Sequence, residues 1–319
     1  MERSELRAGD WVEVRSAEEI LQTLDGEGRR EGMPFMPEMR RFCGRRFRVA
    51  ARADKVCDTS HLTGSRRVPG AVFLQDLRCD GSAHGRCQAE CLLFWKEAWL
   101  KRVPEGASAL PSAPPPPAEV DPLDQHTRVP GEDGAERFRC QATEMHAASD
   151  QLKALDPRPY VHELLTGNAS LGRFLRVSLR ASVREPGHRL GLIPNAPAPG
   201  TRTGPPSPEP PLDLVPGDWV RVKSKEEIAA TLNKEGRHRG LWFDREMVPY
   251  CGRTFRVRAR VNRILDERTG RMLELKNDCV TLEGVVCAGE WSAGRWLCTR
   301  AIFPYWRECW LERVEPPGR

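Results

Sequence analysis

Three cysteines and a histidine lie close together in the first third of the chain, in the segment 79–91. The segment reads CDGSAHGRCQAEC, so seven residues separate Cys79 from Cys87, three separate Cys87 from Cys91, and His84 lies between the first two. Thiolates bind Zn²⁺ tetrahedrally or carry iron–sulfur clusters, and their ligands can be distant in sequence when the fold gathers them. The spacing is not that of a CxxC pair, so it predicts a metal site without naming the metal.

The fourth ligand of such a site has to come from elsewhere in the fold. Cys57 is the first choice, with Cys43 and His84 as alternatives. Cys43 also fits burial, because it lies between Phe42 and a glycine just before an expected strand, where cysteine packs as a small hydrophobe. The expected cofactor is zinc, the commoner metal of small β domains with scattered ligands, and the alternative is an iron–sulfur cluster. The first-choice metal ligands are Cys57, Cys79, Cys87 and Cys91.

The same pattern recurs in a weaker form near the C-terminus. Residues 9–79 align with 217–287 without a gap, at a constant offset of 208. Three cysteine positions are shared: Cys43 with Cys251, Cys79 with Cys287, and Cys87 with Cys298. Leu265 and Ile302 stand where the first copy has Cys57 and Cys91, so we expect the second copy to have lost its metal unless Cys279 replaces a ligand. The weaker candidates in this copy are Cys251, Cys279, Cys287 and Cys298.

The elements that must position these thiols are short strands. Residues 11–15 alternate apolar and polar side chains, as in a half-buried strand. Ser16 and Glu19 form the capping box of a short helix, and Ser224 and Glu227 form its counterpart in the second copy. Further strands are expected over 47–53, 71–77 and 92–103, with a turn-rich connection over 58–70. Short strands around one helical insert suggest a small SH3-like β-barrel.

The predicted fold is mainly β with a helical middle segment. Two tandem SH3-like repeats occupy 9–103 and 216–315, because a unit that recurs intact must fold as one. Pro-rich linkers join them at 104–133 and 191–215, where 27 prolines in the chain make semi-rigid spacers plausible. The helical segment lies between these linkers, at 134–190.

Composition limits the compartment and the partners. The chain shows no apolar h-region near Met1 and no run of apolar residues long enough for a membrane span, which predicts a cytoplasmic protein without membrane contact. In a reducing compartment the 11 cysteines are not expected to form a disulfide framework. With 50 basic and 45 acidic residues, the charges are nearly balanced. Clustered arginines leave a nucleic-acid-binding module as an alternative, but interleaved charges of both signs are typical of a solvated face.

Catalytic signatures are absent. The sequence has no GxSxG, no phosphate loop and no HExxH, so no catalytic residue is expected and the chain is not expected to be an enzyme. The predicted function is a metal-binding scaffold or adaptor that acts through a protein partner. The alternative from another class is an iron–sulfur or thiol-dependent accessory subunit of a biosynthetic enzyme.

Four motifs carry a resemblance to a known group of proteins. They are GDWV near each repeat start, CGRxFRV, CDGSAHGRCQAEC and WxxxWL. With these motifs, the chain resembles an uncharacterised family of bacterial tandem-repeat proteins. The resemblance covers both repeats and, more loosely, the helical middle segment, and it implies no activity.

Overall fold

The computed structural model describes residues 5–105, 123–131, 134–153, 156–193, 197, 200–204, 210–276 and 278–316. Most of its elements are short β-strands, accompanied by a few helices, so the expectation of a mainly β chain is confirmed. Much of the two predicted Pro-rich linkers, including the four prolines at 114–117, lies outside the described residues.

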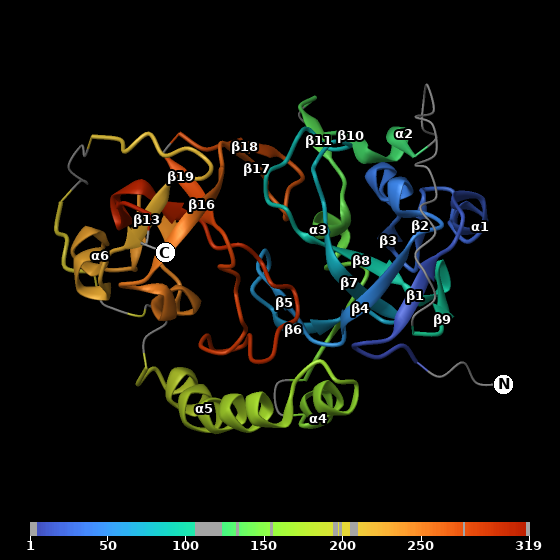
Figure 1. Ribbon diagram of the computed structural model, residues 1–319, viewed down its shortest axis with the longest axis horizontal. Coiled ribbons are helices and arrows are strands. Elements are labelled where there is room, and N and C mark those ends of the chain that lie inside the picture. Colours follow the sequence, from blue (N-terminus) through green and yellow to red (C-terminus); the bar gives the residue numbers. More distant parts are fainter. Residues whose placement is uncertain are drawn as a thin grey trace. The chain divides into compact units, whose positions relative to one another are not determined.

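The chain divides into two compact units. Unit 1 contains Met1–Arg176 together with Leu265–Leu273 and Leu297–Arg300, and unit 2 contains the remainder. Two short segments of the second repeat therefore belong to unit 1. Figure 1 shows one of these segments, in red, beside the β5–β6 hairpin of the first repeat.

Unit 1 contains a five-stranded antiparallel sheet with the order β8-β7-β4-β1-β9 (Figure 1). Its strands are β1 (Trp11–Val14), β4 (Arg46–Arg52), β7 (Ala71–Arg78), β8 (Leu92–Lys96) and β9 (Leu100–Val103). One turn of 3₁₀ helix, η2 (Glu97–Trp99), precedes β9, which returns to pair with β1. The strands expected over 11–15, 47–53 and 71–77 are confirmed.

Local sequence explains the start of this sheet. Val12 and Val14 are fully buried, as the alternation in β1 requires. The capping box of Ser16 and Glu19 is confirmed at helix α1 (Ala17–Leu21). Just after this helix, the Thr23 hydroxyl accepts a hydrogen bond from the Trp99 indole N–H at 3.1 Å, so the polar group of this buried ring has a partner.

Unit 2 repeats this plan with the order β20-β19-β16-β13-β21. Its elements are β13 (Trp219–Val222), α6 (Lys225–Thr231), β16 (Thr254–Arg260), β19 (Cys279–Leu282), β20 (Trp306–Arg307), η4 (Glu308–Trp310) and β21 (Leu311–Arg313). The pairing register is also repeated, since Val12 faces Phe47 and Val220 faces Phe255. The capping box at Ser224 is confirmed as well.

An arginine ion pair recurs in both sheets, buried in the first and partly exposed in the second. Arg52 is 1% exposed and contacts Asp54, Glu97 and the Leu6 carbonyl. Arg260, at the equivalent position, contacts Glu308 at 2.8 Å and the Leu214 carbonyl, and it pairs with Asp278 because the equivalent of Asp54 is an asparagine. Each arginine ties the segment before the first strand to the 3₁₀ turn, which fixes both ends of the sheet.

The connection over 58–70 contains more order than the sequence predicted. It forms a hairpin of β5 (Val56–Asp58) and β6 (Gly64–Arg67), and β12 (Asp150–Gln151) adds a third strand. The second repeat has a related hairpin of β17 (Arg263–Leu265) and β18 (Met272–Glu274). Arg66 explains the first hairpin, because its guanidinium binds Ser149 and the His146 carbonyl from a distant segment.

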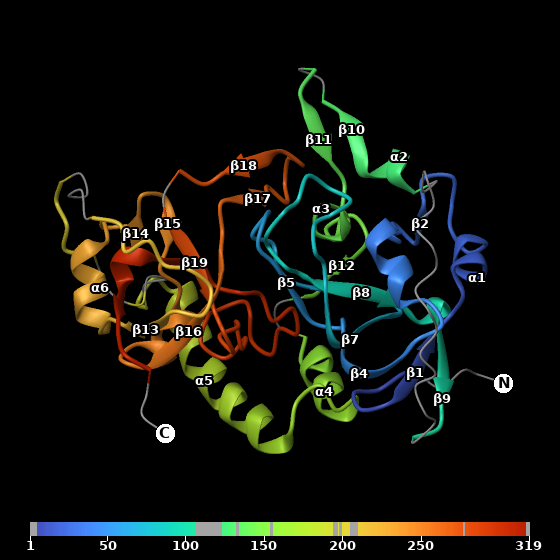
Figure 2. The ribbon, with the colours of Figure 1, turned by 45° about the horizontal axis from the view of Figure 1, so that its top comes forward.

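The remaining elements are small. Two-stranded ladders are formed by β2 (Arg29–Arg30) with β3 (Met33–Pro34), β14 (Arg237–His238) with β15 (Leu241–Trp242), and β10 (Arg128–Pro130) with β11 (Glu136–Phe138), the last visible in Figure 2. Short helical turns are η1 (Pro37–Phe42), η3 (Arg245–Tyr250), α2 (Asp124–Thr127) and α3 (Gln141–Glu144), and two longer helices follow, α4 (Arg158–Leu165) and α5 (Leu171–Arg189). The segment 134–190, expected to be helical, therefore also contains strands. No helix in the described part of the chain is long and apolar enough to cross a membrane.

Candidate metal centre

The cysteine-rich loop 79–91 connects β7 to β8 and is closed at its base. Arg78 pairs with Leu92, and the Cys79 amide donates to the Cys91 carbonyl at 2.9 Å. Inside the loop, Gly81 has φ +71°, and a Cβ added there would lie 2.1 Å from the Cys87 carbonyl oxygen. Only glycine fits this close approach. The loop is thus folded back on itself, and its thiols have defined positions.

One group of possible metal ligands forms between this loop and η1. It consists of Glu38, Cys79 and His84, hereafter the Cys79 triad, whose ligand atoms all lie within 4.8 Å of one another. The Cys79 thiol donates to Glu38 Oε1 at 3.3 Å, and its sulfur lies 3.6 Å from His84 Nε2. His84 Nδ1 lies 3.6 Å from the same carboxylate oxygen.

Burial controls the protonation of the Cys79 triad. It raises the pKa of Glu38 to about 7 and lowers the pKa of His84 to about 4. Burial, reinforced by the Glu38 charge, also raises the pKa of the Cys79 thiol. Without a cation, all three groups therefore tend to stay neutral near pH 6, and a bound cation would offset the cost of charging them.

The geometry of the Cys79 triad fits zinc. A tetrahedral ion with bonds of ~2.3 Å to sulfur and ~2.0 Å to nitrogen places those two atoms ~3.6 Å apart. The Cys79 sulfur and His84 Nε2 have that separation, 3.6 Å. Glu38 Oε2 and His84 Nδ1 are buried without a hydrogen-bond partner. Such buried polar atoms usually indicate a water or an ion.

The second repeat uses the equivalent glutamate differently. Glu246 is 3% exposed and accepts backbone N–H bonds from Glu290, Trp291 and Ser292, at 3.3, 2.7 and 2.8 Å. These amides belong to the loop that follows Cys287, the equivalent of Cys79. In unit 2 the carboxylate therefore holds the loop by itself, whereas in unit 1 the equivalent Glu38 faces a thiol and an imidazole.

Two further thiols of unit 1 accept hydrogen bonds from backbone amides. The Cys57 amide donates to the Cys298 sulfur at 3.2 Å, and the Leu265 amide donates to the Cys87 sulfur at 3.2 Å. The duplication relates these two hydrogen bonds to each other. The donors, Cys57 and Leu265, occupy equivalent positions of the two copies, and so do the acceptors, Cys298 and Cys87. Each of these two shared cysteines thus receives an amide from the other copy's short hairpin.

Cys91 and a buried arginine complete this region. Burial, with the charge of Glu267, raises the pKa of the Cys91 thiol to about 12, while Arg300 opposes the shift and Cys87 adds to it. Arg300 is 4% exposed and donates to the Cys57 carbonyl at 3.0 Å and to Glu267 at 2.8 Å. We refer to Cys57, Cys87, Cys91 and Cys298 as the four-cysteine group.

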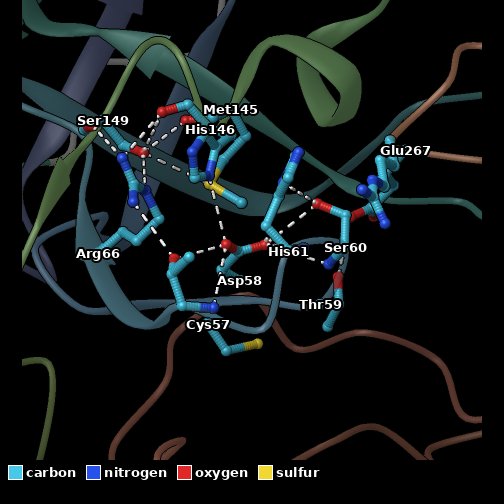
Figure 3. A network of polar contacts seen from close by, with 12 residues as sticks. Cys57, Asp58, Thr59, Ser60, His61, Arg66, Met145, His146, Ser149 and Glu267 are labelled. Atoms are coloured by element: carbon cyan, nitrogen blue, oxygen red, sulfur yellow. Dashed lines mark hydrogen bonds and ion pairs between the residues drawn. The ribbon is translucent and has the colours of Figure 1, made fainter.

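A third cluster surrounds Asp58 (Figure 3). His61 and His146 stack with ring centroids 4.1 Å apart, and their Nδ1 atoms lie 3.7 and 3.3 Å from the Asp58 carboxylate. Burial tends to raise the pKa of Asp58, but hydrogen bonds from Thr63, His61 and Ser60 outweigh it and lower the pKa. Since these donors already occupy the carboxylate, it organises the β5–β6 turn. In Figure 3 the Cys57 sulfur points away from this cluster.

The other candidate cysteines lie apart from these groups. Cys43 and Cys251 are half-buried, and burial raises the pKa of each thiol to about 11. Cys279 accepts a bond from Arg307 at 3.1 Å. All 11 cysteines lie in the described part of the chain, and none forms a disulfide.

Of the four first-choice ligands, Cys79 joins Glu38 and His84, whereas Cys57, Cys87 and Cys91 belong to the four-cysteine group. The sequence did not identify Glu38 as a ligand, although the glutamate is identical in both copies. Glu38 and Cys79 are 41 residues apart, and only the fold brings the carboxylate to the thiol. The sequence also did not identify Arg300 and His146, which reach the first repeat from distant segments.

Comparison with known proteins adds no assignment. No protein-family model, no curated protein and no solved structure matches the chain.

Proposed function

We propose that this protein is a zinc-binding scaffold, with one structural zinc ion held by the Cys79 triad. The observation that carries the proposal is the Cys79 sulfur with two further ligand atoms beside it, His84 Nε2 at 3.6 Å and Glu38 Oε1 at 3.3 Å. The second oxygen of the same carboxylate, Glu38 Oε2, is buried without a hydrogen-bond partner. Sulfur, imidazole nitrogen and carboxylate oxygen are the donors that zinc takes in proteins, whereas magnesium and calcium prefer oxygen alone.

The zinc ion has a mechanical role in this proposal. In unit 2, Glu246 anchors its loop through three backbone amides. In unit 1, a zinc ion would link η1, through Glu38, to both Cys79 and His84 of the loop 79–91. Metal binding then contributes to folding, because the site does not exist in the unfolded chain.

We also propose that each five-stranded sheet forms a small SH3-like barrel. Support comes from the strand order, from the return of the last strand to the first, and from the 3₁₀ turn between the last two strands. Small barrels of this kind present loops on a rigid frame. Two of them in one chain suit an adaptor that contacts a protein partner.

Metal analysis of the purified full-length chain tests the zinc site. We expect about one zinc per chain, lost in Cys79→Ser and in His84→Asn. The matched control is Cys287→Ser, which changes the equivalent position of the second repeat and should keep the zinc. Zinc that survives Cys79→Ser, or a wild-type chain that binds none when zinc is supplied, would contradict the proposal.

A further inference from the structure

We propose that His61 and His146 bind a divalent transition-metal ion, at a site distinct from the Cys79 triad. The two sites share no residue, so this inference does not depend on the zinc proposal. Its first support is position. Among the described residues, Asp58, His61 and His146 form one of two groups whose possible ligand atoms all lie within 4.8 Å of one another.

The two imidazoles come from distant segments and meet in the folded chain. His61 lies in the turn of the β5–β6 hairpin, whereas His146 follows α3, 88 residues after Asp58. Arg66, on β6, donates to the His146 carbonyl at 2.9 Å and so fixes that segment beside the turn. The ring centroids are 4.1 Å apart and the ring planes are 34° from parallel (Figure 3).

The Asp58 carboxylate sets the tautomer of His146. Burial tends to raise the pKa of Asp58, but hydrogen bonds from Thr63, His61 and Ser60 lower it below the ordinary value, so the group is ionised. An ionised carboxylate only accepts hydrogen bonds. The Nδ1 atom of His146, 3.3 Å from Asp58 Oδ2, therefore carries the proton. In the neutral ring, the lone pair that can bind a metal is then on Nε2.

Ser60 sets the tautomer of His61 in the same way. The ionised carboxylate is its stronger acceptor, so the single hydroxyl proton of Ser60 goes to Asp58 Oδ1, 3.1 Å away. The Ser60 oxygen then accepts from His61 Nδ1 at 2.9 Å. Both neutral imidazoles thus offer Nε2 to a metal. Metal-binding histidines have this arrangement, because their other ring nitrogen donates to a group that orients the ring.

The second repeat indicates that the turn itself does not require a histidine. Asp266, the equivalent of Asp58, accepts the Arg268 amide at 3.0 Å and the Thr269 hydroxyl at 2.8 Å. The turn between β17 and β18 therefore forms with Thr269 at the position of His61. Formation of the turn accounts for Asp58 but not for the imidazole, whereas metal binding accounts for both.

The donors and their exposure define the metal. An ion with bonds of ~2.1 Å to nitrogen joins two nitrogens up to ~4.2 Å apart, which is comparable with the 4.1 Å between the ring centroids. Imidazole suits zinc, copper, nickel and iron. The side chains of His61 and His146 are 32% and 35% exposed, so a bound ion keeps positions open for water or another ligand. The negative charge of Asp58 also favours a cation.

Calorimetric titration of the zinc-loaded, tag-free full-length chain with nickel chloride tests the site. We expect about one nickel ion per chain. His61→Thr, which copies the second repeat, and His146→Gln should each weaken nickel binding ~100-fold, and Ser60→Ala should weaken it ~10-fold. Cys79→Ser should bind nickel as the wild type does, so failure of the zinc site and failure of this site are distinguishable.

The matched control is His162→Gln. His162 is 34% exposed and its Nδ1 lies 3.2 Å from Asp54, so it is a histidine of similar exposure beside another aspartate of unit 1. Its replacement should leave the nickel affinity unchanged.

A second measurement needs no variant and therefore no assumption about folding. Diethyl pyrocarbonate modifies accessible imidazole nitrogens, and mass spectrometry of peptides locates the modified residues. In the wild-type chain, nickel should protect His61 and His146 and leave His162 reactive. Nickel binding that survives both histidine variants, protection that extends equally to His162, or the absence of saturable nickel binding would overturn the proposed site.

Discussion

The amide of Cys57 donates a hydrogen bond to the sulfur of Cys298, 3.2 Å away, although 241 residues separate them along the chain. Cys298 belongs to the second repeat, where it aligns with Cys87 of the first, so it would be expected to lie in unit 2. The structure places it in unit 1 instead, with Leu297–Arg300. The thiols of the two copies are therefore not two separate sets, and the first unit collects the larger number.

Glu38 and Glu246 occupy equivalent positions, and we expect their substitution by glutamine to change the stability of the metal-free protein by different amounts. Glu246→Gln replaces a carboxylate oxygen with an NH₂ group among three amide donors and should destabilise unit 2 by about 2–4 kcal/mol. Glu38→Gln should change the free energy of unfolding by less than about 1 kcal/mol, because burial already favours the neutral carboxyl. Urea unfolding of both variants checks this, and equal losses would contradict it.

Zinc binding to the Cys79 triad should tighten as pH rises. Zinc takes the deprotonated forms of Cys79 and Glu38. Burial raises the pKa of Glu38 to about 7 and raises that of Cys79, so two protons must leave below pH 7 and one above it. The apparent affinity should rise ~100-fold per pH unit below pH 7 and ~10-fold above it. Calorimetry in buffers of different ionisation enthalpy counts the protons, and a flat profile would argue against these ligands.

Glu163 should make unit 1 less stable at alkaline pH. Its side chain is fully buried, and burial raises its pKa to about 8, although Asn168 donates to it at 2.9 Å. A folded pKa above the unfolded value means that stability is lost as pH rises through the interval between 4.5 and about 8. The loss over this whole interval should reach roughly 5 kcal/mol.

Glu163→Gln keeps the acceptor for Asn168 and cannot ionise, so its stability should stay flat over the same interval. Thermal unfolding of wild type and variant at pH 6 and pH 9 gives the comparison. If both lose the same stability between these values, another group is responsible.

The equivalent arginines Arg52 and Arg260 should differ in the stability that they contribute. Arg52→Met leaves Asp54, which is 3% exposed, without its guanidinium and should cost about 3–5 kcal/mol. Arg260→Met should cost less, about 1–2 kcal/mol, because Arg260 is itself 27% exposed, Asp278 is 48% exposed, and the buried Glu308 keeps its backbone N–H donors from the segment 212–214. Chemical unfolding of the two single variants tests the difference. A larger loss in Arg260→Met would refute the role of burial.

Local sequence predicted the elements that depend on near neighbours. The alternation in β1 and the capping boxes at Ser16 and Ser224 involve residues within four positions of one another, so they can be read without the rest of the fold. Over 58–70 the sequence predicts only a turn-rich connection, whereas the structure has the β5–β6 hairpin there. Its order comes from Arg66 and Ser149, which are 83 residues apart, and from pairing with β12.

The candidate metal ligands divide in the same way. Residue type and spacing alone predicted that Cys57, Cys79, Cys87 and Cys91 are metal ligands. Only the tertiary structure decided their partners, giving Glu38 and His84 to Cys79 and Cys298 to Cys57. The physical reason is that a ligand set is fixed by where side chains meet after folding, and the loop that carries Cys79 to Cys91 turns those sulfurs toward different neighbours. The sequence determined which atoms could bind a metal, and the fold decided which of them lie together.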